Sequence, residues 1–166
     1  MQLVFVGEII YVPVVTQWEK VGKMYFGSFS HNLDDKGRLM IPRKMREELG
    51  MKVYIMKGFD GALSLYNKDG YQKLVEEFSR LSYNQQKVRD YLRQQFATTY
   101  EMDVDKLGRV QIPTALLTKF NISKEVLVLG IGDHIEVWDK AKYEQYESSV
   151  QGNFEEIAEE LDAKKD

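Results

Sequence analysis

The stretch LDDKGRLMIP at residues 33–42 returns as VDKLGRVQIP at residues 104–113, and five of its ten positions are identical. The identical pairs are Asp34 and Asp105, Gly37 and Gly108, Arg38 and Arg109, Ile41 and Ile112, and Pro42 and Pro113. Similarity continues downstream, after a one-residue slip, from residues 53–66 in the first copy to residues 125–138 in the second. Self-similarity at a fixed offset indicates a duplicated structural unit. The sequence therefore predicts a tandem duplication of a unit of about 50 residues.

Each copy is predicted to begin with a strand and a tight turn. The alternating runs that end at His31 and Glu101 favour strands. The Asp-x-x-Gly-Arg segment that follows predicts a hairpin turn. In it the aspartate carboxylate accepts backbone amides, and Gly37 or Gly108 supplies a positive φ. A second strand is expected to begin at the arginine of each copy.

Two prolines end these second strands. Pro42 and Pro113 lack the amide that a strand ladder needs, but they suit the first turn of a helix. The helices and their C-caps are expected at residues 43–49 with Gly50 and at residues 114–120 with Asn121. Apolar segments farther along predict a second hairpin in each copy. Its strands are residues 53–56 and 62–66 in the first copy and residues 126–129 and 135–138 in the second.

Helical patterns follow both copies. Asn67 and Asp139 stand where N-caps belong, ahead of helices predicted over residues 71–81 and 140–150. A connecting helix is predicted over residues 84–96, because apolar side chains recur on one of its faces. Those side chains are Val88, Tyr91, Leu92 and Phe96. This pattern indicates a packed helix and not a flexible linker.

The last segment, residues 153–163, combines an apolar stripe with many acidic residues. The stripe consists of Phe154, Ile157, Ala158 and Leu161. It could pack on its own domain or form a subunit interface, and the sequence leaves both open. The chain is then divided as follows: extension 1–23, first repeat with trailing helix 24–81, connecting helix 82–96, second repeat with trailing helix 97–150, and acidic helix 151–166.

Composition argues against several classes of protein. The 166 residues include no cysteine, which removes disulfide scaffolds, thiol nucleophiles and thiolate metal sites. His31 and His134 stand apart from each other and from any clustered ligands, so we expect structural histidines and neither a metal site nor a cofactor. The most apolar stretch, residues 3–15, is broken by Glu8 and Pro13 and lacks the features of a secretory signal. We therefore expect a cytoplasmic protein without a membrane segment.

The net charge of −3 is divided unevenly along the chain. Residues 133–166 carry eleven acidic and four basic residues, net −7, whereas residues 1–132 carry net +4. Residues 31–57 hold seven basic and four acidic residues, which is a weak basic patch. On charge alone, solvated mixed charge is the simpler explanation, because a nucleic-acid-binding protein usually shows a stronger basic stripe.

In its repeated motifs the sequence resembles the MraZ family. The resemblance rests on Met-Tyr-Phe-Gly at residues 24–27, on Asp-x-x-x-Arg at residues 34–38 and again at residues 105–109, and on Ile-Pro after each motif. The strand that contains Trp138 extends it toward the end of the chain. The similarity covers residues 24–161, and the doubled motif makes it specific.

The resemblance implies an α+β, mainly β fold. In it two tandem AbrB-like (swapped-hairpin) modules form a pseudo-twofold β-barrel with flanking helices. It also implies a transcription regulator that binds double-stranded DNA, acts on the division and cell-wall gene cluster, associates with the nucleoid and assembles into rings. The DNA-binding signature of that family falls here on Asp34, Arg38, Asp105 and Arg109. Residues 1–23 have no counterpart in the family pattern, which suggests an upstream start or a cloning artefact.

The residues themselves support DNA binding beside the resemblance. An arginine fixed at the end of a turn presents a planar guanidinium that can bridge two acceptors on guanine or clamp a phosphate. Two such turns from paired copies would form a platform able to meet a groove, with neighbouring basic side chains on phosphates. These neighbours are Lys36, Arg43, Lys44, Arg46 and Lys106. The simpler alternative is that each Asp–Arg pair only braces its hairpin.

Other functions stay open at this point. A small hydrolase would need Asp34 and Asp105 as paired carboxylates, but the adjacent arginines should keep both ionised, so we expect no enzyme activity and see no small-molecule substrate. An antitoxin-like module would bind DNA and neutralise a toxin through its C-terminal tail. A purely structural ring would bind no DNA. We expect a homo-oligomer larger than a dimer, because strand edges and apolar helix faces need cover.

Overall fold

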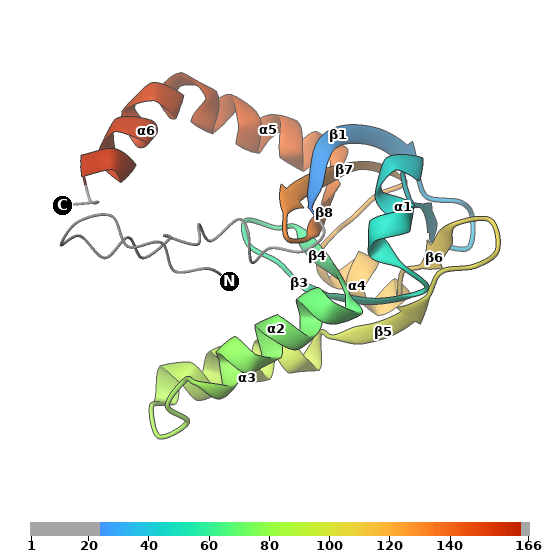
Figure 1. The fold of residues 1–166 in the computed structure, drawn as a ribbon. Helices are drawn as coiled ribbons and strands as arrows, with labels where there is room; N and C mark the ends of the chain where they lie inside the picture. Colours follow the sequence, from blue (N-terminus) through green and yellow to red (C-terminus); the bar gives the residue numbers. More distant parts are fainter. Residues whose placement is uncertain (1–23, 164–166) are drawn as a thin grey trace, which may run out of the picture.

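A computed structural model describes residues 24–163 of the protein, so the predicted extension over residues 1–23 lies outside the described part. The fold is mixed α+β, with a curved sheet and helices at its ends (Figure 1). In chain order the elements are β1 (Tyr25–Asn32), β2 (Arg38–Met40), α1 (Arg43–Leu49), β3 (Lys52–Lys57), β4 (Leu63–Asn67), α2 (Lys68–Ser79), α3 (Gln86–Ala97), β5 (Tyr100–Asp103), β6 (Arg109–Gln111), α4 (Thr114–Lys119), β7 (Glu125–Gly132), β8 (Ile135–Asp139), α5 (Lys140–Val150), a 3₁₀ turn (Gln151–Asn153) and α6 (Phe154–Asp162).

Six strands form one antiparallel sheet in the order β1-β7-β8-β4-β3-β5, and β2 and β6 form a separate ribbon. The predicted β-barrel is therefore wrong, since within residues 24–163 the sheet stays open, with β1 and β5 at its edges. The physical reason lies in Pro42 and Pro113, which follow β2 and β6 almost at once and cannot donate to a ladder. These three-residue strands are too short to join the two edges.

Each copy of the repeat contributes a strand to the other copy. Strand β1 of the first copy pairs with β7 of the second along eight residues, with Tyr25 opposite Gly132. Strand β5 of the second copy pairs with β3 of the first, with Lys52 opposite Asp103. The hairpins β3–β4 and β7–β8 are local, as predicted, and meet where β4 pairs with β8.

The turn after β1 does not lead into a local hairpin, contrary to the prediction. Strand β2 begins at Arg38 as expected, but its partner is β6 of the second copy. Two backbone hydrogen bonds close the turn itself, from Asp34 N to Arg38 O at 3.1 Å and from Gly37 N to Asp34 O at 2.9 Å. A local hairpin does not form because all eight residues of β1 already pair with β7, and β2 is only three residues long and ends at Met40.

One hydrophobic core serves both copies. Its best-buried side chains alternate along the strands of each copy and are at most 1% exposed. They include Leu39, Ile41, Val53, Ile55, Leu63, Leu65, Val110, Ile112, Val126, Val128, Ile135 and Val137. Full burial of one such side chain stabilises a fold by about 1.5–3 kcal/mol. A unit of about 50 residues buries too little surface alone, so the two copies share a core.

The helix boundaries follow the predicted caps. The side chain of Asn67 accepts a hydrogen bond from Gly70 N, and that of Asp139 accepts one from Lys142 N. Helix α5 therefore spans the predicted residues, while α2 (Lys68–Ser79) both starts and ends earlier than the predicted residues 71–81. Pro42 and Pro113 are the N-cap residues of α1 and α4 instead of lying in their first turns.

The C-caps confirm one prediction and correct the other. Gly50 is the C-cap of α1 as predicted, with a φ of 76°. For α4 the C-cap is Phe120, and the predicted residue Asn121 follows it with a φ of 49°. The asparagine therefore still supplies the left-handed position that ends the helix.

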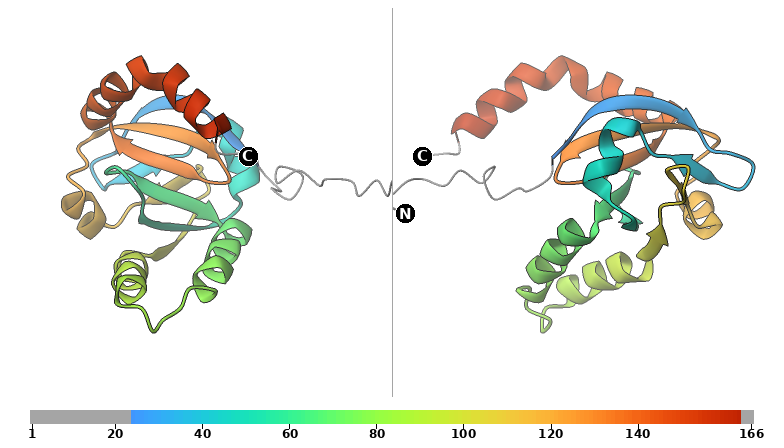
Figure 2. Two further views of the ribbon diagram at one scale, coloured as in Figure 1. Left: turned by 90° about the vertical axis from the view of Figure 1, so that its left-hand side faces the viewer. Right: turned by 45° about the vertical axis from the view of Figure 1, so that its right-hand side comes forward.

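The connecting helix is packed, as predicted, through Tyr91 and Leu92, whereas Phe96 of the predicted face is 45% exposed and Gln95 is buried. Helices α2 and α3 lie side by side and extend from one end of the sheet (Figure 2). Tyr91 meets Phe78 edge to face at 5.7 Å, and Phe78 makes a similar contact with Phe96. Phe78 is buried together with Met56 and Tyr66 of the sheet, which anchors the helix pair to the fold.

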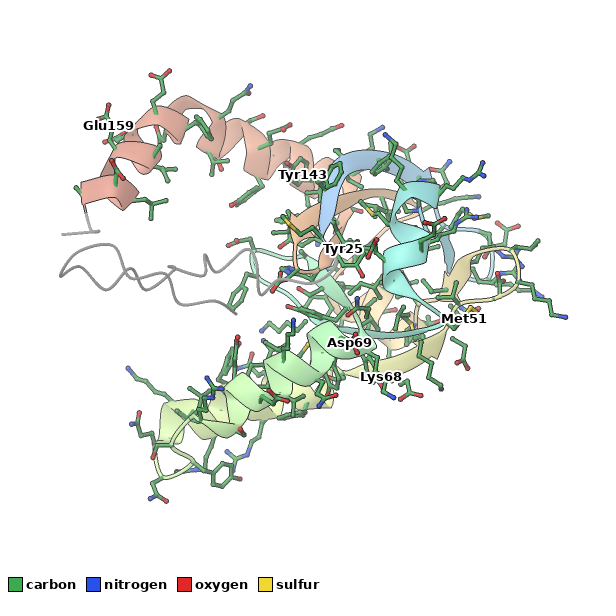
Figure 3. All side chains as sticks on the ribbon, in the orientation of Figure 1. Tyr25, Met51, Lys68, Asp69, Tyr143 and Glu159 are labelled. Carbon is green, nitrogen blue, oxygen red and sulfur yellow. The ribbon has the colours of Figure 1, made fainter. Side chains whose placement is uncertain are left out.

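The C-terminal helices form a second extension on another side of the sheet. The apolar stripe of α6 is exposed, with Phe154 at 75% and Leu161 at 60%, so in this chain it does not pack on its own domain. Side chains of α6, including Glu159, project into solvent far from the sheet (Figure 3). Among residues 24–163 no helix has the length and apolar character needed to cross a bilayer.

Candidate nucleic-acid interface

The first Asp-x-x-x-Arg motif forms a closed turn, residues 34–38, called here the first turn. Asp34 Oδ1 accepts hydrogen bonds from Lys36 N at 2.9 Å and from Arg38 N at 3.0 Å. Asp34 Oδ2 accepts a third from Arg38 Nε at 2.6 Å. Gly37 has the predicted positive φ, 73°, and its amide bonds Asp34 O at 2.9 Å. The aspartate therefore sets both the backbone of the turn and the direction of the arginine.

The second motif, residues 105–109 and called the second turn, repeats this geometry. Asp105 Oδ1 accepts from Leu107 N and Arg109 N, both at 2.9 Å, and Oδ2 accepts from Arg109 Nε at 2.8 Å. Gly108 has a φ of 79°. The predicted roles of the aspartates and glycines in the turns are confirmed at both copies.

Both arginines keep their outer nitrogens available. Each aspartate engages Nε, and within residues 24–163 the Nη atoms of Arg38 and Arg109 make no hydrogen bond or salt bridge. The two side chains are 29% and 23% exposed. A guanidinium bound on one edge and open on the other can donate two parallel hydrogen bonds to a base edge or a phosphate.

The aspartates stay ionised in this arrangement. The backbone hydrogen bond from Arg38 is the main cause that holds the pKa of Asp34 below its ordinary value, and it outweighs desolvation. The backbone amide of Arg109 lowers the pKa of Asp105 in the same way. General acid-base chemistry needs a carboxyl that can take up a proton near neutral pH, so this geometry does not suit a paired-carboxylate hydrolase.

The ribbon of β2 and β6 brings the two turns together (Figure 1). Leu39 lies opposite Val110 and both are buried, so the alternate residues Arg38 and Arg109 face away from the core on the other side of the ribbon. Cross-bonds lock the pair, because Ile41 N donates to the Gly108 carbonyl at 3.0 Å. The equivalent bond runs from Ile112 N to the Gly37 carbonyl at 3.2 Å.

The two turns are supported by different side chains. A Cβ placed on Gly108 would lie 2.5 Å from Arg46 Nε, so the Arg46 side chain lies directly on the second turn. Arg46 is held there by hydrogen bonds from Nε to the Ile41 carbonyl at 2.8 Å and from Nη2 to Met40 Sδ at 2.9 Å.

At the first turn the equivalent position is occupied by an apolar side chain. Leu117 Cδ1 would lie 3.2 Å from a Cβ on Gly37. In addition, Gln111 Nε2 donates to the Lys36 carbonyl, which ties β6 to this turn. Lys124 Nζ lies 3.4 Å from Asp35 Oδ1 and partly offsets the extra acid of the first turn.

The other predicted basic residues divide into two groups. Lys36 and Lys106 lie on the turns, and Arg43 and Lys44 lie in the first turn of α1; all four are exposed. Within residues 24–163 none of their side-chain nitrogens makes a hydrogen bond or salt bridge, so they remain available to a polyanion. Arg46 differs, because its guanidinium is used to support the second turn.

Sequence reasoning missed Gln111, Leu117 and Met40 as supports of the turns. A signal was present in the repeat alignment, where Arg46 corresponds to Leu117 and Met40 corresponds to Gln111. Positions that differ between two otherwise matching copies mark places where the copies have different neighbours. The pairing of β2 with β6 was needed to see those neighbours.

Comparisons with known proteins agree with the repeat. A family model described as "MraZ protein, putative antitoxin-like" matches residues 24–94 and again residues 95–165. The protein named "Transcriptional regulator MraZ" of Mesoplasma florum is 42% identical over 137 residues, which cover 82% of this chain and 94% of the relative. The protein of the same name from Mycoplasmoides gallisepticum is 38% identical over 139 residues, 84% of this chain and 98% of the relative. That of Syntrophomonas wolfei is 36% identical over 138 residues, 83% and 96%.

Proposed function

Because the chain belongs to the MraZ family, we propose that it is a transcriptional regulator that binds double-stranded DNA through both Asp-x-x-x-Arg turns. The relatives are named as transcriptional regulators, which is not an enzymatic function and agrees with the expectation that the chain is no enzyme. The observation that carries the proposal is the β2–β6 ribbon, which faces Arg38 and Arg109 the same way with their Nη atoms open.

Each turn is suited to a groove. A guanidinium that donates from two nitrogens matches the O6 and N7 acceptors of guanine, which lie in the major groove. The exposed Lys36, Arg43, Lys44 and Lys106 are then the phosphate contacts that fix orientation without reading sequence. In this proposal the strands that each copy contributes to the other, β1 and β5, correspond to a swapped-hairpin pairing of two AbrB-like modules.

A single chain offers few contacts, and several chains would multiply them. We propose a homo-oligomeric ring in which the turns of every subunit face the DNA and the acidic helices lie elsewhere. The acidic α6 lies on the opposite side of the molecule from the turns, which supports this arrangement (Figure 1). Linked weak contacts act at high effective concentration, so the operator should consist of several short, regularly spaced repeats. Action on division and cell-wall genes, within the nucleoid, belongs to the same proposal.

The test is to incubate the purified full chain with random genomic fragments and to sequence those retained. We expect retained fragments to share tandem repeats. Synthetic duplexes with two repeats should bind far more tightly than duplexes with one, and insertion of half a helical turn between the repeats should abolish the gain. Affinity should fall with salt, with a log–log slope of about −0.9 for each phosphate contact.

The matched control is Arg93→Ala, which removes an exposed arginine of α3 that pairs with Asp90 and lies far from the turns. It should bind like the wild type. Retention without any shared sequence would contradict a specific regulator. An oligomer that retains no DNA even at low salt would favour the structural alternative. A monomer whose affinity does not depend on the number and spacing of the repeats would favour the antitoxin-like alternative.

A further inference from the structure

The apex residue of the two turns differs in chemistry. Lys36 stands at the apex of the first turn, and Leu107 stands at the same position of the second. Leu107 is 61% exposed, although its neighbours Lys106 and Arg109 are both cationic. A leucine exposed at this place gains nothing from the core, because the hydrophobic effect acts only on surface removed from water.

The position of Leu107 is fixed by the same atoms that fix Arg109. Its amide donates to Asp105 Oδ1 at 2.9 Å, and that oxygen also accepts from Arg109 N at 2.9 Å. The next residue, Gly108, is covered by Arg46, which is itself hydrogen-bonded to the Ile41 carbonyl. Leu107 and the Arg109 guanidinium therefore approach any surface together, as parts of one braced turn.

We propose that Leu107 contacts the C5-methyl group of a thymine in the major groove, beside the base that Arg109 contacts. This rests on the proposed function, in which the turns meet DNA. The thymine methyl is the apolar group that base edges present in the major groove, and apolar side chains pair with it. The second turn thus reads an apolar feature, whereas the first turn presents an ammonium group at the same place and has no such preference.

The magnitude follows from burial of one methyl group. Removing one buried carbon group from an apolar contact lowers affinity about threefold to fourfold. Because the contact is made once per second turn, an oligomer on several repeats should show the effect at one thymine of each repeat. The remaining thymines should be neutral.

The test replaces thymine by deoxyuridine, which removes only the methyl group and keeps base pairing. The probe is a duplex that the full-length wild-type protein has selected from a random-sequence pool. Each thymine is replaced singly, and dissociation constants are measured by fluorescence anisotropy. The affinity of the wild type should fall about threefold to fourfold when one particular thymine of a repeat is replaced. Leu107→Ala should bind the unmodified duplex and that deoxyuridine duplex with equal affinity.

Two controls separate the contact from effects on DNA shape and on folding. Lys36→Ala changes the apex of the first turn and removes a proposed phosphate contact, so it should lower affinity for the thymine and deoxyuridine duplexes alike and keep the wild-type ratio between them. Leu107 is exposed, so Leu107→Ala should keep the thermal melt of the wild type.

Every outcome decides between the two proposals. A wild type that binds the selected duplex but is indifferent to deoxyuridine at all positions overturns the role of Leu107 and leaves DNA binding intact. A deoxyuridine effect that persists in Leu107→Ala assigns the methyl contact to another group and also overturns it. Failure to select any duplex contradicts the proposed function itself.

Discussion

The first and second turns have the same backbone and the same Asp–Arg hydrogen bonds, yet their charges are placed differently. In the first turn the cation, Lys36, is at the exposed apex and the support behind Gly37 is Leu117. In the second turn the apex residue Leu107 is apolar, with the exposed Lys106 before it, and Arg46 lies against Gly108. A duplicated motif has thus kept its geometry while exchanging the positions of charged and apolar groups. The backbone of each turn is therefore fixed by hydrogen bonds within its own copy, whereas the side chain that packs on its glycine comes from the other copy.

A second contrast lies in the hairpin turns at the other end of each copy. In the first copy the buried residue before β4 is Ala62, and at the matching place of the second copy stands His134. His134 Nδ1 lies 2.6 Å from Asp133 Oδ1, Nε2 lies 3.8 Å from Glu136 Oε1, and the ring stacks on Tyr66 at 4.9 Å. The second copy therefore has a partly buried ionic cluster, with the Asp133 side chain 64% exposed, where the first copy uses packing.

Removing the guanidinium groups of Arg38 and Arg109 should have the largest effect on DNA binding, because both turns present this group. Arg38→Ala combined with Arg109→Ala should weaken specific binding by about 2–6 kcal/mol, as each bidentate contact contributes about 1–3 kcal/mol. Anisotropy titrations on the selected duplex measure this, with thermal melts to show that folding survives. Unchanged affinity in a double variant with a normal melt would remove the turns from the interface.

Alkaline pH should lower the stability of the fold through His134, which the second copy carries and the first copy lacks. Burial alone would lower the pKa of His134, but hydrogen bonds and charge from Asp133 and Glu136 outweigh it and raise the pKa to about 9. A raised pKa stabilises the fold fully below the ordinary value of 6.5, and the stabilisation is lost as pH rises through 9.

The free energy of unfolding should therefore fall by on the order of 1–3 kcal/mol between pH 6.5 and pH 10, since solvent screens the exposed Asp133 carboxylate. Urea titrations across this range provide the measurement, and His134→Gln should flatten that part of the profile. A variant whose pH profile overlays that of the wild type would contradict the ionic cluster.

Glycine substitutions test the different supports directly. Gly37→Ala and Gly108→Ala both place a side chain at positive φ, at a cost of about 1–2 kcal/mol. Gly108→Ala should cost about 1 kcal/mol more, because its Cβ displaces Arg46 from the Ile41 carbonyl and Met40.

Chemical denaturation gives the two free energies, and the same pair is then made in an Arg46→Ala background. There the two alanine substitutions should cost the same, since the displaced side chain is gone. A difference that survives in this background would show that Arg46 is not its cause.

The smallest expected effect is the lowering of the pKa of the two aspartates, which should be alike in both turns. The carboxyls of Asp34 and Asp105 should both titrate below their ordinary value of 3.8, so that the turn bonds persist above it and weaken as pH falls through the lowered pKa. Carbon-detected NMR of the side chains measures both. Arg38→Ala should raise the pKa of Asp34 and leave that of Asp105 unchanged. Ordinary pKa values at both sites would mean that the hydrogen bonds are not formed in solution.

Local features of the fold could be predicted from the sequence. The Asp-x-x-Gly-Arg turns, the strands that begin at Arg38 and Arg109, and the caps at Asn67 and Asp139 depend on neighbours within four residues. A residue type with a known local preference, such as aspartate beside turn amides, is enough to place them. The hydrophobic alternation located the sheet strands for the same reason.

Pairing between the copies could not be predicted in this way. A period of two tells which face of a strand is buried, and not which strand lies beside it. The predicted closed barrel failed there, since β2 pairs with β6 and leaves β1 and β5 apart. The prediction that Arg46 reaches phosphate meets the same difficulty, because the side chain turns toward Gly108 of the other copy.

The central claim, that both arginine forks face DNA, is tested most directly by methylation interference at guanine N7. The selected duplex is methylated sparsely, bound and unbound fractions are separated, and interfering guanines are mapped for the wild type, Arg38→Ala and Arg109→Ala. We predict two sets of interfering guanines in the wild type, of which Arg38→Ala loses one and Arg109→Ala loses the other. Identical interference maps in all three proteins would contradict the claim.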